Sequence, residues 1–144
     1  MRKLGLVILA AATLMLAGCG GGGGGSSSTP SVAPAIDGTG TWRGSTTETA
    51  FGTTTTTLNV VQNGASLTGT YSSTYGTGTI SGTVSGSTVN ATISPTGCTG
   101  TLNISGTVST NSSNQQVLPI SGSGTYSCGG TTYNNSVTGN LIKQ

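Results

Sequence analysis

The stretch that decides the fold runs from Cys98 to Cys128 and reads CTGTLNISGTVSTNSSNQQVLPISGSGTYSC. The Asn and Ser residues around Ser113 are typical of a turn between two strands. Centring a hairpin there places Ile104 opposite Gly122, and the same register places the two end cysteines opposite each other. The cysteines are not needed to choose this register. Large residues meet glycines repeatedly along the hairpin, an alternation of sizes that fills a tight interior.

The same kind of sequence continues on both sides of this hairpin. Thr, Ser, Gly and β-branched residues dominate from residue 36 onward, with period-two alternation and no helical periodicity. A short phrase, an aliphatic residue followed by Thr or Ser and then Gly, recurs along the chain at irregular spacing. The expected strands are 39–47, 53–62, 66–73, 77–85, 88–94, 98–109, 116–128 and 135–142.

Turn residues set the register of the earlier strands. The Asn-Gly pair at 63–64 is typical of a type I′ hairpin and would place Val60 opposite Leu67. A longer loop after the next strand would then place Tyr71 opposite Ile80.

The Gly-Ser pair at 86–87 suits a type II′ turn instead. This turn places Val84 opposite Val89 and Ile80 opposite Ile93, which keeps the apolar residues on one face.

Eight antiparallel strands in hairpin order predict an all-β, up-and-down barrel. Closure would protect the edges of an uncharged sheet from pairing with other chains. A β-sandwich of the same strands is the alternative. The inward positions include Trp42, Leu58, Ile80, Ile93, Leu102, Ile104, Leu118, Ile120 and Leu141, and the outward ones Thr68, Thr70, Thr79, Ser81, Thr83, Asn90, Thr92, Asn103, Ser105 and Thr107.

The N-terminus has the order of an export signal. Arg2 and Lys3 precede the apolar stretch 4–16, and the small residues at 17–18 stand directly before Cys19. The stretch is too short to span a bilayer comfortably. This Leu-Ala-Gly-Cys ending resembles the lipobox of bacterial lipoproteins. An ordinary secretory signal, with a cysteine there by chance, is the alternative.

The lipobox resemblance implies that residues 1–18 are a signal peptide and that Cys19 is lipidated. Diacylglycerol and a further fatty acyl chain such as palmitate would anchor the protein to the membrane of the cell envelope. Gly20, in place of the Asp that tends to retain lipoproteins in the inner membrane, favours the outer membrane by the same resemblance. The Gly-, Ser- and Pro-rich residues 19–35 then form a flexible linker, and 36–144 the β-domain.

Removal of the signal peptide changes the charge balance. Only Arg43, Lys143, Asp37 and Glu48 remain, and their charges cancel. The chain therefore has no basic patch that would predict nucleic-acid binding.

Two cysteines remain once Cys19 carries lipid. In an exported chain Cys98 and Cys128 are expected to form a structural disulfide. A metal or redox pair is the alternative, but a chain without His and with two mature carboxylates lacks ligands for a metal.

The first expected strand opens with Gly40-Thr41-Trp42. This resembles the Gly-x-Trp signature of the calycin families, lipocalins and avidins. The resemblance implies a barrel in which a basic side chain, here Lys143 or Arg43, stacks over Trp42.

A second short motif, Leu67 to Tyr71 with Ser73, is similar to the avidin segment whose Tyr and Ser contact biotin. Trp42 and Tyr71 are therefore the candidate ligand-binding residues, with a place in the barrel core as the alternative for both. Biotin itself is not expected, because the chain has a single Trp and nothing acidic after Glu48.

The residue inventory argues against catalysis. The chain has no His, and no Ser or Thr has a recognisable base beside it. We therefore expect a non-enzyme that needs no cofactor. Two functions remain: a structural or interaction lipoprotein, with envelope proteins or glycans as partners, and a calycin-like carrier of a small apolar molecule. Inward glycines are compatible with a cavity or with a filled barrel, and we favour a filled one.

Overall fold

A computed structural model describes residues 32–144. The expected signal peptide (1–18), Cys19 and most of the expected linker lie outside the described residues. Within residues 32–144 there is no helix of the length and apolarity needed to cross a bilayer.

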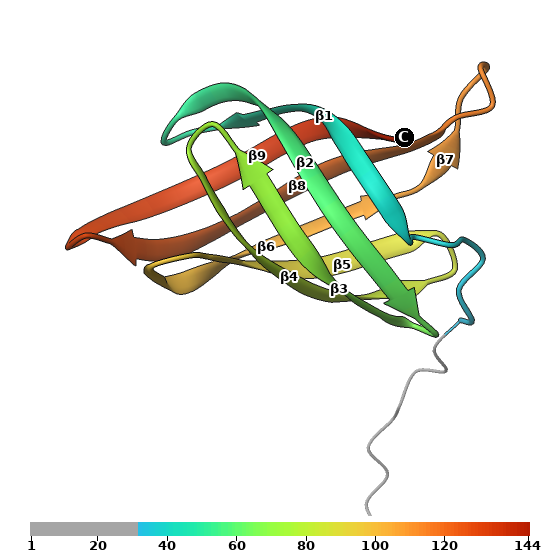
Figure 1. Ribbon diagram of the computed structural model, residues 1–144, viewed down its shortest axis with the longest axis horizontal. Helices are drawn as coiled ribbons and strands as arrows, with labels where there is room; N and C mark the ends of the chain where they lie inside the picture. The colour runs from blue at the N-terminus through green and yellow to red at the C-terminus, as the bar shows by residue number, and fades with distance from the viewer. Residues whose placement is uncertain (1–31) are drawn as a thin grey trace, which may run out of the picture.

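The described chain folds into antiparallel strands joined by short turns (Figure 1). In chain order they are β1 (Gly40–Glu48), β2 (Gly52–Asn63), β3 (Ser66–Ser73), β4 (Gly76–Ser85), β5 (Thr88–Pro95), β6 (Cys98–Thr107), β7 (Ser109–Thr110), β8 (Gln116–Cys128) and β9 (Thr131–Lys143).

Each long strand pairs with its neighbours in sequence, and two further ladders close the sheet. The first strand pairs with the last, β1 with β9, and β6 pairs with β8 beyond the two-residue β7. The result is the predicted eight-stranded up-and-down barrel and not the alternative sandwich. Closure satisfies the backbone donors and acceptors that an open sheet would leave at its edges.

The registers of two hairpins match the sequence analysis. In the β4–β5 hairpin, Val84 lies opposite Val89 and Ile80 opposite Ile93. The β6–β8 ladder runs from Gly106 opposite Ile120 to the paired cysteines, as the turn around Ser113 predicts.

The predicted register of the β2–β3 hairpin is wrong by two residues. Val60 pairs with Gly69 instead of Leu67, because Asn63 forms the last ladder pair and Gly64 takes the first place of the turn. Gly64 has φ +58°, the left-handed backbone that glycine adopts without steric cost.

The β3–β4 register departs from the prediction in the same way. Tyr71 lies opposite Gly78 and Ile80 opposite Gly69, because a tight turn follows the Ser73–Gly76 pair where a longer loop was expected. Both shifts are even, so the set of inward-facing residues is unchanged.

The barrel interior is a single apolar core. The inward residues named from the sequence are all buried, with Leu141 fully enclosed. Inward glycines face large side chains on the next strand, as Gly122 faces Ile104 and Gly124 faces Leu102. A Cβ on Gly122 would lie 2.0 Å from the Asn103 carbonyl oxygen, so the strands approach too closely for any side chain there. The interior is therefore filled, as the sequence analysis favoured.

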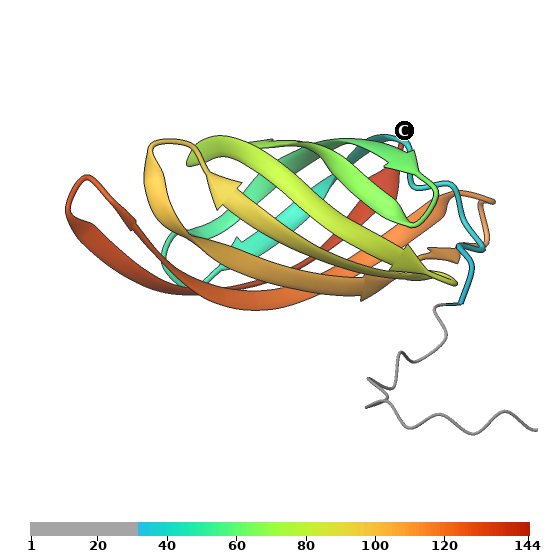
Figure 2. The ribbon, with the colours of Figure 1, turned by 90° about the horizontal axis from the view of Figure 1, so that it is seen from below.

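The barrel has two different ends. The described chain begins at one end of the barrel, where residues 32 and 33 contact the β4–β5 turn. The C-terminus and the β2–β3 turn lie at the same end (Figure 1). The β1–β2, β3–β4, β5–β6 and β8–β9 turns lie at the other end, where the β8–β9 hairpin projects beyond the rest (Figure 2).

Candidate functional site

Trp42 seals the end of the barrel where the chain enters. Its ring is 2% exposed, and its indole Nε1 donates a hydrogen bond to the Gly38 carbonyl at 2.9 Å. The Lys143 ammonium of β9 lies 5.8 Å from the ring centroid and donates to the Asp37 carbonyl at 2.7 Å. The basic residue over Trp42 that the calycin resemblance implied is thus Lys143.

The segment before β1 is tied across this end. Gln62 accepts a hydrogen bond from the Gly38 backbone and donates to the Ile36 carbonyl. Further back, the Ala35 backbone N–H bonds to the Gly86 carbonyl, and Gly86 in turn donates to Ala33. The last residues of the expected linker therefore lie against the β4–β5 turn and help to close the barrel.

Little empty space remains inside. A void of about 30 Å³ lies against Trp42, and its lining is entirely apolar. A second void of about 40 Å³ lies further along the barrel, between Leu58 and Tyr126. Each is near the volume of one water molecule, about 30 Å³.

The opposite end is open. A cavity of about 200 Å³ lies at this end, which we call the mouth. Its lining contains the single Phe and all four Tyr residues of the chain, together with one carboxylate. The mouth residues are Glu48, Phe51, Tyr71, Ser73, Tyr75, Gly76, Thr77, Pro95, Thr96, Cys98, Tyr126, Cys128 and Tyr133.

Four of the rings form a continuous row. Phe51 stacks on Tyr75 with ring centroids 5.2 Å apart, and on its other side it lies 5.1 Å from Tyr133. Tyr133 lies 5.6 Å from Tyr126, its direct partner in the β8–β9 ladder. The row joins three different hairpins across the mouth, and Tyr75, at its end, is 49% exposed.

The buried side chain of Asn135 links the strands and the turn that surround the mouth. Its side chain is 3% exposed, and its amide donates to the Glu48 carboxylate and, at 3.2 Å, to the Tyr126 hydroxyl. Its carbonyl oxygen accepts hydrogen bonds from the Thr49 hydroxyl and the Ala50 backbone. Asn135 therefore fixes the β1–β2 turn, which carries Phe51, against β9.

Two phenols of the mouth have raised pKa values. Burial, with the negative charge of Glu48 and the neighbouring Tyr126 adding to it, raises the pKa of Tyr71 to about 12. Burial also raises the pKa of Tyr126, against the opposing effect of the hydrogen bond from Asn135. Both hydroxyls therefore stay protonated near neutral pH.

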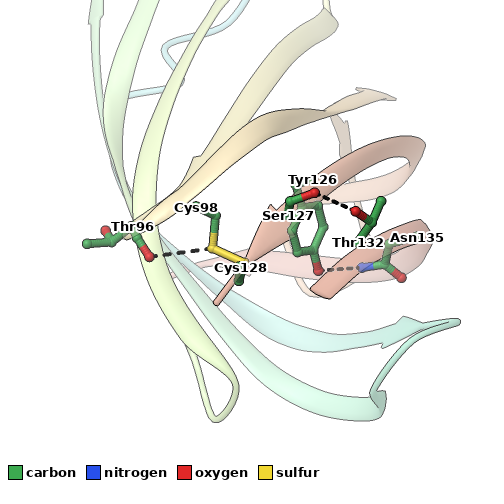
Figure 3. The surroundings of a disulfide bond; sticks show 7 residues. All are labelled: Thr96, Cys98, Tyr126, Ser127, Cys128, Thr132 and Asn135. Carbon is green, nitrogen blue, oxygen red and sulfur yellow. Dashed lines mark hydrogen bonds between the residues drawn. A yellow bond between two sulfur atoms is a disulfide. The ribbon is translucent and has the colours of Figure 1, made fainter. Parts of the chain in front are cut away.

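The predicted Cys98–Cys128 disulfide lies on the rim of the mouth (Figure 3). The two cysteines are direct ladder partners with Cα atoms 4.4 Å apart. Beside them Tyr126 points toward Asn135, and the Ser127 and Thr132 hydroxyls bond at 2.7 Å to brace the projecting hairpin. The bridge thus ties β6 to β8 at the open end.

The two candidate ligand residues are not brought together. Trp42 lies at the sealed end and Tyr71 at the mouth, although Leu58 pairs with both in the ladders. The strands of a barrel are tilted, so residues that pair across successive strands lie at successively different positions along the barrel axis. Leu58 fills the space between the two rings and lines both internal voids.

The sequence analysis missed most of the mouth. Phe51, Tyr75 and Tyr133 lie in or beside the β1–β2, β3–β4 and β8–β9 turns. Alternate turns of an up-and-down barrel share one end, so placing these aromatic residues on the predicted hairpins would have brought them together. Tyr126 and Asn135 gave no comparable signal.

The outer wall has a second, shallow hollow of about 470 Å³ over β4, β5, β6 and β8. Its lining has no charged or aromatic side chain and consists mainly of small polar residues: Ser81, Asn90, Thr92, Asn103, Ser105, Ser121 and Ser123. It offers hydrogen bonds without a group to orient a ligand, and we therefore take the mouth as the candidate site.

Comparison with known proteins found no matching family model, no matching curated protein and no matching solved structure. The mouth must therefore be interpreted from its own chemistry. It offers aromatic rings, phenol hydroxyls and one carboxylate, which suit binding. No group of three or more potential metal ligands occurs among residues 32–144.

Proposed function

We propose that this protein is a lipid-anchored protein of the bacterial envelope whose barrel is a non-catalytic interaction domain, with the mouth as its binding face. One observation carries the proposal. The aromatic mouth opens at the end of the barrel opposite to the one that residue 32 enters (Figure 1). A tether at the sealed end would therefore present the mouth away from the membrane.

The support for the tether is in the sequence. Leu16-Ala17-Gly18-Cys19 has the form of a lipobox, and Gly20 favours the outer membrane. Two or more acyl chains give stable anchoring, which a single chain does not.

The chemistry of the mouth favours binding over catalysis. Glu48 is the only carboxylate in its lining, and the chain has no His to act as a general base. A paired-carboxylate mechanism therefore lacks its second group. Envelope proteins and glycans remain suitable partners, because aromatic rings flanked by hydroxyls bind both classes.

The alternative, a carrier of a small apolar molecule, has less support. The internal voids of about 40 and 30 Å³ are far below the 300–1,000 Å³ typical of ligand pockets. A bound fatty acid would have to displace packed core residues.

The anchor is tested by labelling cells with a fatty acid probe and fractionating their membranes. The wild-type protein and the control Ser26→Ala should take up the probe and sediment with membranes. Cys19→Ser should lose both properties. Unchanged membrane association of Cys19→Ser would refute the tether.

The binding face is tested by photo-crosslinking in cells, read by intact mass so that small and large ligands are both detected. A photoreactive residue in place of Thr77, in the mouth, should give adducts. The same replacement of Thr68, exposed on the outer wall of β3, serves as the control. Adducts that form equally at both positions would count against the mouth.

A further inference from the structure

The mouth contains a carboxylate without a cationic partner. Glu48 receives one neutral hydrogen bond, from Asn135, on its Oε2 atom. The basic residues of the described chain are Arg43 and Lys143, and both lie toward the sealed end. Lys143 is held over Trp42, and Arg43 precedes Glu48 by five strand residues, about 16 Å. The charge of Glu48 is therefore balanced by nothing within the mouth.

The rings add to this negative potential. The face of an aromatic ring is electron-rich and attracts a cation placed within about 6 Å of its centre. Tyr75 offers an exposed ring at the end of the row, and Tyr71 lines the same cavity from β3. Both lie in the lining together with Glu48, so a ligand in the cavity contacts aromatic rings and the carboxylate together.

We infer that the mouth binds a small organic cation, a quaternary or methylated ammonium group, held between aromatic faces and the Glu48 carboxylate. This inference deepens the proposed binding role and rests on the mouth being the working face. The cavity of about 200 Å³ is smaller than the 300–1,000 Å³ typical of pockets for drug-sized ligands, which suits a small headgroup and not an extended chain.

Other ligand classes fit less well. An anion would meet the charge of Glu48 and the negative faces of the rings. An apolar molecule would remove water from Glu48 and leave its charge unpaired, which is costly. A neutral sugar would satisfy hydrogen bonds but would not balance the charge. A methylated ammonium balances it, and its weak hydration makes transfer to an aromatic site inexpensive.

The test is a titration of the isotope-labelled full mature chain, in a polyoxyethylene detergent, followed by NMR. The probes are choline and its uncharged isostere 3,3-dimethylbutanol. We expect choline to shift the amide resonances of Glu48, Phe51 and Tyr75 and to leave the Trp42 indole resonance unmoved. The isostere should give no saturable shift at the same concentrations. Equal binding of the two probes, or no binding of choline, would overturn the inference.

Variants separate the charge from the rings. Glu48→Gln should weaken choline binding by about tenfold or more, because it removes the charge and keeps an acceptor for Asn135. Asp37→Asn removes the other mature carboxylate, at the sealed end, and should leave the affinity unchanged. Tyr75→Leu should weaken binding several-fold and is available if Glu48→Gln fails to fold. Equal effects of Glu48→Gln and Asp37→Asn would contradict the assigned site.

Titration with phosphocholine distinguishes a free cation from a lipid headgroup as the source of the ammonium. Phosphocholine carries a phosphate close to the ammonium, and we expect it to bind more weakly than choline because that phosphate approaches Glu48. This result supports a free cation as the ligand, whereas equal binding supports a lipid headgroup. Preferential binding of N-acetylglucosamine over both would overturn the inference in favour of glycans. The titration needs no membrane, so its failure is distinct from failure of the tether.

Discussion

The side-chain amide of Asn135 donates a hydrogen bond to the carboxylate of Glu48, although 87 residues separate the two. The contact joins the last residue of β1 to the middle of β9. The same buried side chain serves the Tyr126 hydroxyl and two groups of the β1–β2 turn. One residue thus organises the floor of the mouth, and its removal would affect both stability and the shape of the site.

We expect Asn135→Ala to lower the free energy of unfolding by about 2–3 kcal/mol, because it leaves buried polar partners without hydrogen bonds. Urea unfolding followed by circular dichroism measures the loss. Asn134→Ala is the matched control, since Asn134 is exposed and its side chain accepts one hydrogen bond, from the Thr125 hydroxyl. The control should change stability by less than about 0.5 kcal/mol. Comparable losses in the two variants would contradict a special role for Asn135.

A second prediction concerns the close approach of strands at inward glycines. A Cβ on Gly122 would lie 2.0 Å from the Asn103 carbonyl oxygen and 2.7 Å from the Ile104 Cα, both backbone atoms that cannot move independently. We expect Gly122→Ala to destabilise the barrel by about 1–3 kcal/mol. Gly76→Ala is the control, because the methyl group it adds would meet nothing within 4 Å beyond its chain neighbours. Gly76→Ala should be neutral or slightly stabilising. Urea unfolding followed by circular dichroism measures both variants.

This pairing of glycines with large residues explains how far the sequence could predict the fold. In the β6–β8 hairpin it agrees with the turn around Ser113, and the register that they predict is correct, including the cysteine pair. The β2–β3 register predicted from the Asn-Gly turn signal is wrong by two residues. A type I′ turn at 63–64 needs positive φ at both residues, and among non-glycine residues of the described chain only Asn114 has it. The register from the Asn-Gly signal places Leu58 opposite Gly69, so the pairing rule is satisfied there too and does not select the observed Val60–Gly69 pair. The rule does select the β3–β4 register, in which Ile80 faces Gly69 and Tyr71 faces Gly78.

The candidate site was less predictable for a physical reason. Strand patterns decide which face a residue occupies, but the mouth depends on which turns share an end and on how barrel tilt displaces ladder neighbours. Trp42 and Tyr71 were grouped by their resemblance to short motifs, and the tilt separates them. Asn135 lies in a polar, largely exposed stretch of β9, and its burial depends on contacts with Glu48 and the β1–β2 turn, which are distant in the sequence.

A third prediction concerns the disulfide. Cys98 and Cys128 close a loop of 30 residues, so the bridge restricts the unfolded chain and contributes roughly 3–4 kcal/mol. We expect the double variant Cys98→Ala, Cys128→Ala to lose that amount of unfolding free energy and therefore to unfold at a lower urea concentration. Addition of a reductant should destabilise the wild type and leave the double variant unaffected. Labelling of two thiols in the unreduced, unfolded barrel domain would contradict the bridge itself.

The last prediction concerns alkaline pH. The pKa of Tyr71 is raised by burial to about 12 in the folded state, against about 10 in an unfolded chain. Below pH 10 both states keep the proton, so Tyr71 makes no pH-dependent contribution. Between pH 10 and 12 the unfolded state loses its proton first, so stability must fall as pH rises.

Urea midpoints measured from pH 9 to 11.5 should fall less steeply for Tyr71→Phe than for the wild type. Tyr126, whose pKa burial also raises, accounts for part of the remaining slope. Identical slopes in the wild type and Tyr71→Phe would show that the Tyr71 hydroxyl is not held in the protected environment of the mouth.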